Sequence, residues 1–186
     1  MLTDGRVAIR PYAAEDVDAV LEAGLESTAQ LSPWFPWAHD GIVADQVAEF
    51  IKTRNELWTA NVERSFAIID AASGRYLGGL WLNQLDREAN RANLGFWVRT
   101  SALRQGIASA AARLAVRYAF DEMQLDAVEI VVAIGFEPAL RVAQATGARP
   151  LGIMPRKLEL RGARVEAQVF VVERPVSATE ATPGTP

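Results

Sequence analysis

The stretch GFWVRTSALRQGIASAAARLAVRYAF, residues 95–120, decides the fold because its hydrophobic period changes partway along. Strand-like alternation ends near Arg99, and apolar residues at three- and four-residue spacing then predict a helix over Gly106–Met123. The helix begins with a run of small residues. Free N–H groups at a helix start attract a phosphate, and small residues let phosphate oxygens reach the backbone. An ordinary strand-loop-helix joint, with alanines packed on the sheet, explains the same spacing equally well.

Segments on both sides of this stretch alternate between strand and helix periods, which indicates a mixed sheet with helices on its faces. The predicted strands are Arg6–Arg10, Ser65–Ile69, Tyr76–Asn83, Ala92–Arg99, Ala127–Ala133, Leu151–Leu160 and Val165–Glu173. The predicted helices are Ala14–Leu25, Ala44–Thr59, Gly106–Met123 and Pro138–Thr146. The Pro-, Thr-, Ala- and Ser-rich tail from Pro175 to Pro186 is predicted to be disordered.

The composition excludes several classes of function. A chain of 186 residues, 50% hydrophobic with a net charge of -4, predicts one globular domain and argues against a general nucleic-acid binder. The absence of cysteine excludes disulfides, thiolate zinc sites and a cysteine nucleophile, and without a signal-peptide pattern it favours the cytoplasm. No apolar run is long enough to span a membrane. Because His39 is the single histidine, a two-histidine metal centre cannot form, and we predict no metal site.

The segment LSPWFPWAHD, Leu31–Asp40, is predicted to be a stiff loop because two prolines stand among three large aromatic residues. Its aromatic residues, together with Trp58, form an apolar wall suited to a peptide or an aromatic acceptor. The alternative is that these side chains fasten the loop to the core. Trp81 and Trp97 lie on predicted strands, which favours core positions for both.

The sequence resembles the GNAT superfamily of acetyl-CoA-dependent N-acetyltransferases, in the RimJ/RimL-like branch that acetylates ribosomal-protein N-termini. The resemblance runs from Leu2 to about Arg174 and depends on several segments in a fixed order. They are RVAIRPYAAEDVDAV, LSPWFPWA, SFAIID with SGRYLGGLWL, NLGFWV, LRQGIASAAARLAVRYAF and VEIVVAIGFEPALRVAQATGARPLG. It implies one α+β domain over residues 1–174, with a mostly antiparallel sheet of about seven strands that splays between Ala92–Arg99 and Ala127–Ala133.

The same resemblance implies that acetyl-CoA is the cosubstrate and lies in the splay. Its pantetheine would pair with the backbone of Trp97, Val98 and Arg99, and the Val98 N–H would polarise the thioester carbonyl. Phe136 occupies a pantetheine-contacting position. The pyrophosphate would bind the N–H groups of Gln105, Gly106, Ile107, Ala108 and Ser109, with Arg104 adding a phosphate contact.

The sequence departs from the family pattern in four places, one of which covers two residues. Leu103 replaces the first Arg or Gln of the phosphate loop, so weaker but not abolished CoA binding is expected. Phe136 and Ala139 stand where the family has the Asn and Ser that hold pantetheine and protonate the departing thiolate. Asn93 stands in place of a glutamate, and Phe170 in place of a tyrosine. The usual acid and base assignments therefore do not transfer.

The remaining base candidates are His39, Asp40, Glu159 and Glu166. Histidine is the side-chain type suited to base work at neutral pH, and His39 lies in a loop resembling a substrate-side loop. A solvated loop histidine is the alternative. Glu159 is next to a strand position where some relatives carry a carboxylate, but alternation turns it to the opposite face, where it would form a surface ion pair. Asp40 fits a turn cap, and Glu166 fits an ion pair with a neighbouring arginine.

The expected function is direct transfer of an acetyl group from acetyl-CoA to a primary amine, on a protein N-terminus or a small molecule. Because the usual acid and base side chains are missing, the alternative is a CoA-binding sensor or interaction module that has lost turnover. A third alternative is a groove that Leu103 and Phe136 have narrowed for another ligand. Neither nucleic acid nor membrane is expected as a partner, and the resemblance allows a homodimer.

Overall fold

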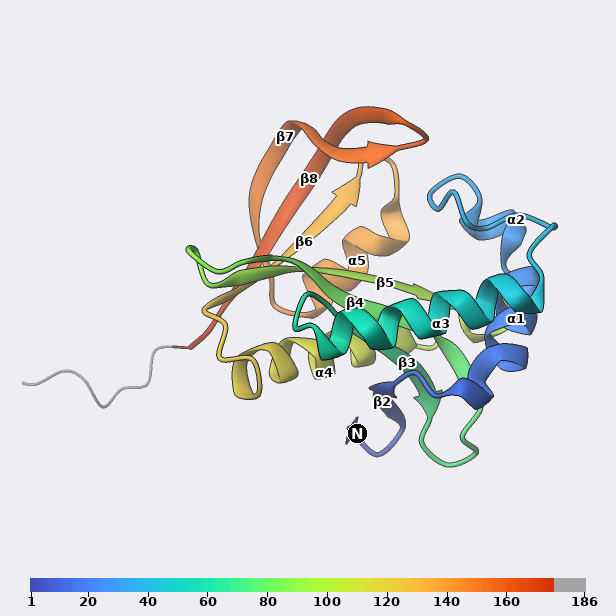
Figure 1. Cartoon of the computed structure of the whole chain (residues 1–186). Coiled ribbons are helices and arrows are strands. Elements are labelled where there is room, and N and C mark those ends of the chain that lie inside the picture. The colour runs from blue at the N-terminus through green and yellow to red at the C-terminus, as the bar shows by residue number, and fades with distance from the viewer. Residues whose placement is uncertain (176–186) are drawn as a thin grey trace, which may run out of the picture.

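The computed structural model describes residues 1–175 as a single eight-stranded sheet with helices on both faces (Figure 1). The strand order is β1-β2-β3-β4-β5-β6-β8-β7. The strands are β1 Leu2–Thr3, β2 Val7–Pro11, β3 Arg64–Asp70, β4 Tyr76–Asp86, β5 Arg91–Val98, β6 Ala127–Ala133, β7 Arg149–Leu160 and β8 Ala163–Glu173. The helices are η1 Ala14–Asp16, α1 Val17–Glu26, α2 Thr28–Leu31, α3 Ala44–Thr59, η2 Thr100–Ala102, α4 Ile107–Asp121 and α5 Glu137–Ala145.

The seven predicted strands and four predicted helices are confirmed, and β6 and α3 have the predicted bounds. The eighth strand, β1, pairs with β2 through two residues, too few for an alternating pattern to reveal. The start of the predicted helix over Ala14–Leu25 is instead the 3-10 turn η1. Of the predicted disordered tail, residues 176–186 lie outside the described residues.

Strand alternation divides the core between the two faces of the sheet. On β5, Leu94 and Val98 face α4, whereas Trp97 packs among residues of α1 and α3 on the other face. The buried face of α4 is made largely of alanine, including Ala111 and Ala115, so this helix approaches the sheet closely. The strand β5 therefore has a helix-covered layer on each side, one mostly aliphatic and one rich in aromatic residues.

The sheet splays between β5 and β6, as predicted. These two strands are parallel and in register only from Arg91↔Ala127 to Asn93↔Glu129. Beyond Asn93, β5 continues along β4, whereas β6 stays paired with β8 to its last residue, Ala133. Figure 1 shows the resulting divergence, with the C-terminal ends of β5 and β6 pointing in different directions. All other neighbouring strands are antiparallel, which confirms the mostly antiparallel sheet.

None of the helices within residues 1–175 has both the length and the apolar composition needed to cross a membrane.

Candidate active site

The start of α4 has backbone N–H groups that no side chain of residues 1–175 caps, the arrangement that an anion site requires. Gly106 precedes the helix with φ +75°, and no side chain of residues 1–175 caps the first turn. Arg104 also has a positive φ, +58°, so the turn bends the chain directly into the helix. The first N–H groups of an α-helix have no partner within it, and here Ile107, Ala108 and Ser109 provide them. Arg104 is exposed and makes no hydrogen bond within the described residues, so its guanidinium can reach a phosphate.

The edge of β5 determines which backbone groups face the splay. The Arg99 N–H donates to the Leu77 carbonyl oxygen of β4 at 2.8 Å, and the Arg99 carbonyl accepts from Ala102 at 3.0 Å. Because backbone direction alternates along a strand, Trp97 also faces β4, and Phe96 and Val98 face the opening between β5 and β6. The Val98 N–H therefore points into the splay, as its predicted role requires.

This alternation corrects part of the expected pantetheine pairing. The backbone of Arg99 is occupied by Leu77 and Ala102, and the backbone of Trp97 faces the neighbouring strand. The groups that can pair with an extended ligand are those of Phe96 and Val98. Gly78 lies opposite Val98, and a Cβ there would come within 2.2 Å of the Trp97 carbonyl oxygen, so glycine permits the close approach of β4 and β5.

The Arg99 side chain joins α1 to the end of β5. It is 3% exposed, and its guanidinium binds Glu22 and Glu26, with the Nε to Glu26 Oε2 distance at 2.8 Å. The Ser101 N–H also donates to Glu26, at 2.6 Å. Hydrogen bonding from Arg99 lowers the pKa of Glu26 to about 2. Arg99 therefore fixes the strand end that carries Val98 and has no free charge for a phosphate.

An aromatic stack crosses the mouth of the splay. The ring of Phe136, at the start of α5, stacks on Trp34 with centroids 4.4 Å apart and an interplanar angle of 6°. Arg161, in the β7–β8 turn, donates to the Ser32 carbonyl oxygen at 3.0 Å. Both contacts hold the loop that follows α2 against the β6–β8 half of the molecule. Trp34 therefore fastens the loop, which is the alternative considered for this aromatic residue.

A cavity of about 580 Å³ lies on the other face of β5, between the sheet, α1 and α3. We call it the aromatic cavity. Phe35 contacts Trp37 and Trp81, with centroids 5.7 and 6.2 Å apart, and Trp37 lies 5.2 Å from Trp97. Its lining residues are Tyr12, Val20, Gly24, Phe35, Trp37, His39, Ile42, Gln46, Val47, Phe50, Arg54, Tyr76, Trp81, Asn83 and Trp97.

The structure separates the aromatic residues that were grouped in the predicted wall. Phe35 and Trp37 line the aromatic cavity, so they fit the expected wall. Trp58 does not, because it packs against Phe66 and Tyr118 near the other end of α3. Trp81 and Trp97, expected in the core, are packed side chains that also line the cavity.

His39 lines the aromatic cavity but is oriented poorly for base work. Its Nδ1 accepts the Gly41 N–H at 3.1 Å, so the neutral ring carries its proton on Nε2. The lone pair of Nδ1 thus accepts a hydrogen bond from the backbone of the same loop. The other ring nitrogen, Nε2, belongs to an exposed side chain and is a donor. This arrangement argues against the predicted role of His39 as general base.

The three carboxylate candidates are all exposed. Glu159 lies on the protruding β7–β8 hairpin, opposite Arg164 in the register, and Glu166 lies on β8 of the same hairpin. Asp40 lies in the loop before α3. None of the three makes an ion pair within residues 1–175, so the surface pairs considered for Glu159 and Glu166 are not formed. No group of three or more His, Cys, Asp or Glu within these residues could hold a metal ion.

The sequence analysis singled out Asn93 but missed the row of polar groups around it, where the splay begins. The Asn93 amide donates to Asn83 Oδ1 across β4 and β5 at 3.0 Å. Glu129, paired with Asn93 in register, is 8% exposed and holds Arg91 at 2.8 Å and Lys157 at 3.1 Å. Both carboxylate oxygens are therefore occupied by cations. These residues come from four strands, so no local motif could have brought them together.

A buried hydroxyl pair closes one end of the aromatic cavity. The Tyr12 and Tyr76 oxygens lie 3.2 Å apart. Burial raises the pKa of Tyr12 to about 12 and raises the pKa of Tyr76 as well. Both hydroxyls therefore stay protonated at neutral pH, and the pair provides hydrogen-bonding capacity rather than charge.

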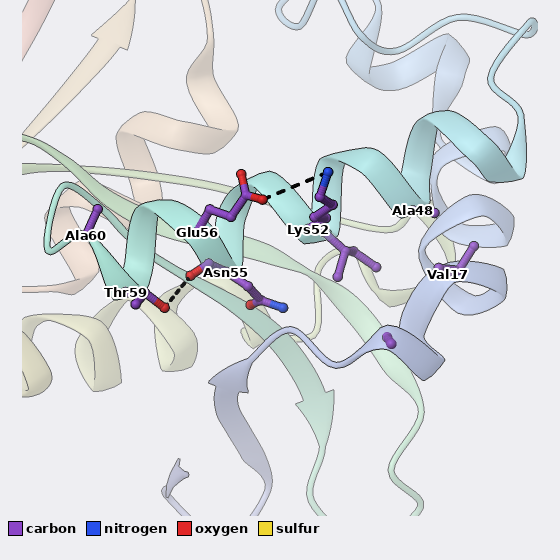
Figure 2. Close-up of a pocket in the computed structure, with 9 residues that line it drawn as sticks. Val17, Ala48, Lys52, Asn55, Glu56, Thr59 and Ala60 are labelled. Carbon is purple, nitrogen blue, oxygen red and sulfur yellow. Dashed lines mark hydrogen bonds and ion pairs between the residues drawn. The ribbon is translucent and has the colours of Figure 1, made fainter.

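A second hollow, of about 700 Å³, runs along the outer side of α3 near η1 (Figure 2). Some of its polar side chains contact neighbouring turns of the same helix. Lys52 lies 3.9 Å from Glu56, and the Thr59 hydroxyl donates to the backbone carbonyl oxygen of Asn55 at 3.0 Å. The side chains of Lys52 and Glu56 are each more than 60% exposed. This hollow is lined by no residue of β5 or of the splay, so we place the candidate site at the splay and the aromatic cavity.

Comparison with known proteins agrees with this geometry. A family model described as an acetyltransferase (GNAT) domain matches residues 6–149. A protein named ribosomal N-acetyltransferase YdaF, from Bacillus subtilis (strain 168), is 27% identical over 143 residues, which cover 76% of each chain. Among solved structures, RimJ of Mycobacterium smegmatis in complex with CoA-disulfide has a TM-score of 0.78 and 24% identity, covering 90% of this chain and 81% of that one. RimL, a ribosomal alpha-N-protein acetyltransferase in complex with coenzyme A, has a TM-score of 0.83 and 16% identity, covering 92% and 96%.

The splayed sheet with helices on both faces is the fold of these solved acetyltransferase structures. The family model covers more than half of the chain, and the chain therefore belongs to the GNAT acetyltransferase family. It is an N-acetyltransferase, and acetyl-CoA is its cosubstrate.

Proposed function

We propose that the protein transfers the acetyl group of acetyl-CoA directly to a primary amine, with the cosubstrate in the splay and the amine in the aromatic cavity. The observation that carries this proposal is the position of β5. One edge of the strand offers Val98 and Phe96 backbone groups to the splay, and one face offers Trp97 to the cavity. Both substrates therefore meet at adjacent residues of a single strand.

The cosubstrate is held mostly by backbone. The N–H groups of Ile107, Ala108 and Ser109 bind the pyrophosphate, and Arg104 adds charge. The pantetheine lies along the free edge of β5 and under the Trp34–Phe136 stack. Apolar contact with Phe136 replaces the side-chain hydrogen bond that an asparagine gives in relatives. The phosphate loop still binds the pyrophosphate although Leu103 replaces the usual polar residue, because the backbone N–H groups do not depend on that side chain.

The chemistry needs a neutral amine close to the thioester carbon. The Val98 N–H stabilises the charge that develops on the carbonyl oxygen during attack. Among the described residues, those that line the aromatic cavity include no carboxylate, and the His39 lone pair is occupied. The amine therefore loses its proton to water, and the enzyme acts chiefly by holding the two reactants together.

Calorimetry with acetyl-CoA and with free CoA, followed by an amine screen, tests this function. Micromolar binding with transfer to an amine is the expected result. Binding without transfer to any amine, or hydrolysis alone, would instead support the CoA-binding module. Absence of heat at millimolar acetyl-CoA would contradict the assigned cosubstrate site.

A pH profile tests the absence of an enzyme base. Because the acceptor itself loses the proton to water, kcat/KM rises with pH up to the amine pKa of whichever acceptor is used. Two acceptors with different amine pKa values should give correspondingly displaced profiles. A common inflection for both would show that a group on the enzyme is the base.

A further inference from the structure

We propose that the acceptor is an α-amino group carried by an aromatic or large apolar residue, bound in the aromatic cavity. This inference rests on the proposed function and narrows it to one chemical class. The cavity volume of about 580 Å³ is within the ordinary range for small-molecule sites and fits an amino-acid residue with its first peptide group. Three observations define the class of acceptor: the apolar walls of the cavity, the charge of its lining residues, and the Asn83–Asn93 pair at one end.

The walls offer ring surfaces to a ligand. Phe35, Trp37, Trp81 and Trp97 meet in tilted or edge-on contacts rather than in parallel stacks. Such contacts leave part of each ring available to a further aromatic or aliphatic group. Trp37 is 39% exposed, although it lies against buried Trp97. A side chain that covers Trp37 removes apolar surface from water on both partners, which favours bulky apolar acceptors over serine or alanine.

The charge of the lining selects against polycationic amines. Across residues 1–175, no aspartate or glutamate lines the cavity, and Arg54 is its only permanently charged residue. Arg54 binds Glu63 through Nη1 at 2.9 Å, whereas its Nε is buried and, like Nη2, has no hydrogen-bond partner within that range. An α-amine is followed by a carbonyl or carboxylate group, whose oxygen supplies an acceptor for the unpaired Nη2 group.

The asparagine pair supplies the polar end. Asn83 lines the cavity and is bonded to Asn93, whose Oδ1 is buried without a hydrogen-bond partner in the described part of the chain. Rotating both amides by a half turn exchanges their oxygens and nitrogens, and one buried amide atom is still left unpaired. An unpaired buried polar atom is costly, so a ligand that satisfies this pair gains affinity. We assign the acceptor N–H to Oδ1 of Asn83, the member of the pair that lines the cavity, and Asn93, which bonds to that amide, is a positioning residue.

Acetylation of a peptide series tests the inference on the intact protein. Dipeptide amides that begin with Phe, Trp or Leu are compared with those that begin with Ser, Ala or Asp, and with spermidine. We expect kcat/KM at least tenfold higher for the first group, with spermidine the poorest. Equal rates for all amines, or a preference for Ser, Ala or spermidine, would overturn the inference but leave the proposed function standing. Transfer to no amine despite acetyl-CoA binding would contradict the proposed function itself.

Variants of the cavity give a second, independent test. Trp37→Ala should reduce kcat/KM for the Phe peptide at least tenfold and for the Ser peptide less than threefold. Asn93→Leu should raise KM for every acceptor and leave the acetyl-CoA Kd unchanged. Val62→Ala removes a similarly exposed apolar side chain outside the cavity and serves as the matched control. An unchanged Phe-to-Ser ratio in Trp37→Ala would contradict the inference, and if that variant fails to fold, the wild-type series alone decides.

Discussion

The two sides of β5 are built from different parts of the chain. The splay side presents backbone groups: the N–H of Val98 and the first turn of α4 after Gly106. The cavity side presents side chains, above all Phe35, Trp37 and Trp97, which come from a loop and a strand far apart in sequence. A site made of backbone tolerates changed side chains, whereas a site made of side chains changes its specificity with each substitution. This difference explains how a family member can lose several usual side chains and keep its cosubstrate.

The largest effect is expected from a substitution at the start of α4, on the splay side of β5. Gly106→Glu places a carboxylate in open space beside the free N–H groups of α4, since no atom of the described residues lies within 4 Å of the position that its Cβ would take. We expect the acetyl-CoA Kd to rise by about 100-fold or more, measured by calorimetry, because the new charge repels phosphate at close range. Gly106→Gln imposes the same backbone strain at φ +75° without the charge and is the matched control. Equal losses in both variants would show that strain, not anion binding, is responsible.

A smaller effect concerns the clamp between α1 and β5. The pKa of Glu26 is lowered to about 2 from 4.5 by Arg99, so its contribution to stability is fully present above pH 4.5 and is lost as the pH falls toward 2. Glu26→Gln should lower the free energy of unfolding by about 1–2 kcal/mol near pH 7. Urea denaturation at a series of pH values from neutral down toward the lowered pKa should show the two proteins converging. A difference in the free energy of unfolding between the two proteins that does not narrow in acid would contradict this role of Glu26.

The stack of Trp34 on Phe136 gives a third test, because it joins the loop after α2 to the start of α5. Aromatic pairs contribute about 0.5–1.5 kcal/mol beyond area burial, so Trp34→Ala and Phe136→Ala should show a coupling of about 1 kcal/mol in a double-mutant cycle of unfolding. Chemical denaturation of the wild type, both single variants and the double variant provides the four values. Additive losses would mean that the two rings contribute independently.

The smallest effect is expected at His39. Because its Nδ1 is bonded to Gly41 and its Nε2 is a donor, His39→Gln should change kcat by less than threefold at neutral pH. A glutamine amide can replace the donor. Steady-state kinetics with the best acceptor measures the change. A loss of about 100-fold or more would instead make His39 the base.

The elements of the fold were predictable because each has its own local period. The range of β6 and the start of the α4 region follow from apolar spacing and a glycine. The role of Val98 was implied by the family resemblance and stays a prediction. Pantetheine pairing was assigned to Trp97 and Arg99 because composition does not show which edge of a strand is already bonded. That property depends on Leu77, a residue of another strand.

The acceptor side was less predictable because its contacts join distant segments. The loop aromatics were visible in the sequence, but nothing local distinguished Trp37, which lines the cavity, from Trp34, which stacks on Phe136. Arg54 and Asn83 carried no motif at all, since the bonds of Arg54 to Glu63 and of Asn83 to Asn93 form only in the folded chain. Local sequence therefore indicates the helix start beside the splay, whereas only the tertiary structure shows which side chains line the aromatic cavity.

The short parallel contact between β5 and β6 has a consequence for cooperativity. Three register pairs join the strands β1–β5 to the strands β6, β8 and β7, while every strand within the second group is paired along most of its length. Local opening in proteins follows such cooperative units. Native-state hydrogen exchange should therefore separate two classes of amides, and the β7–β8 class should exchange first. Occupation of the splay by acetyl-CoA would bridge the units and merge the two classes into one.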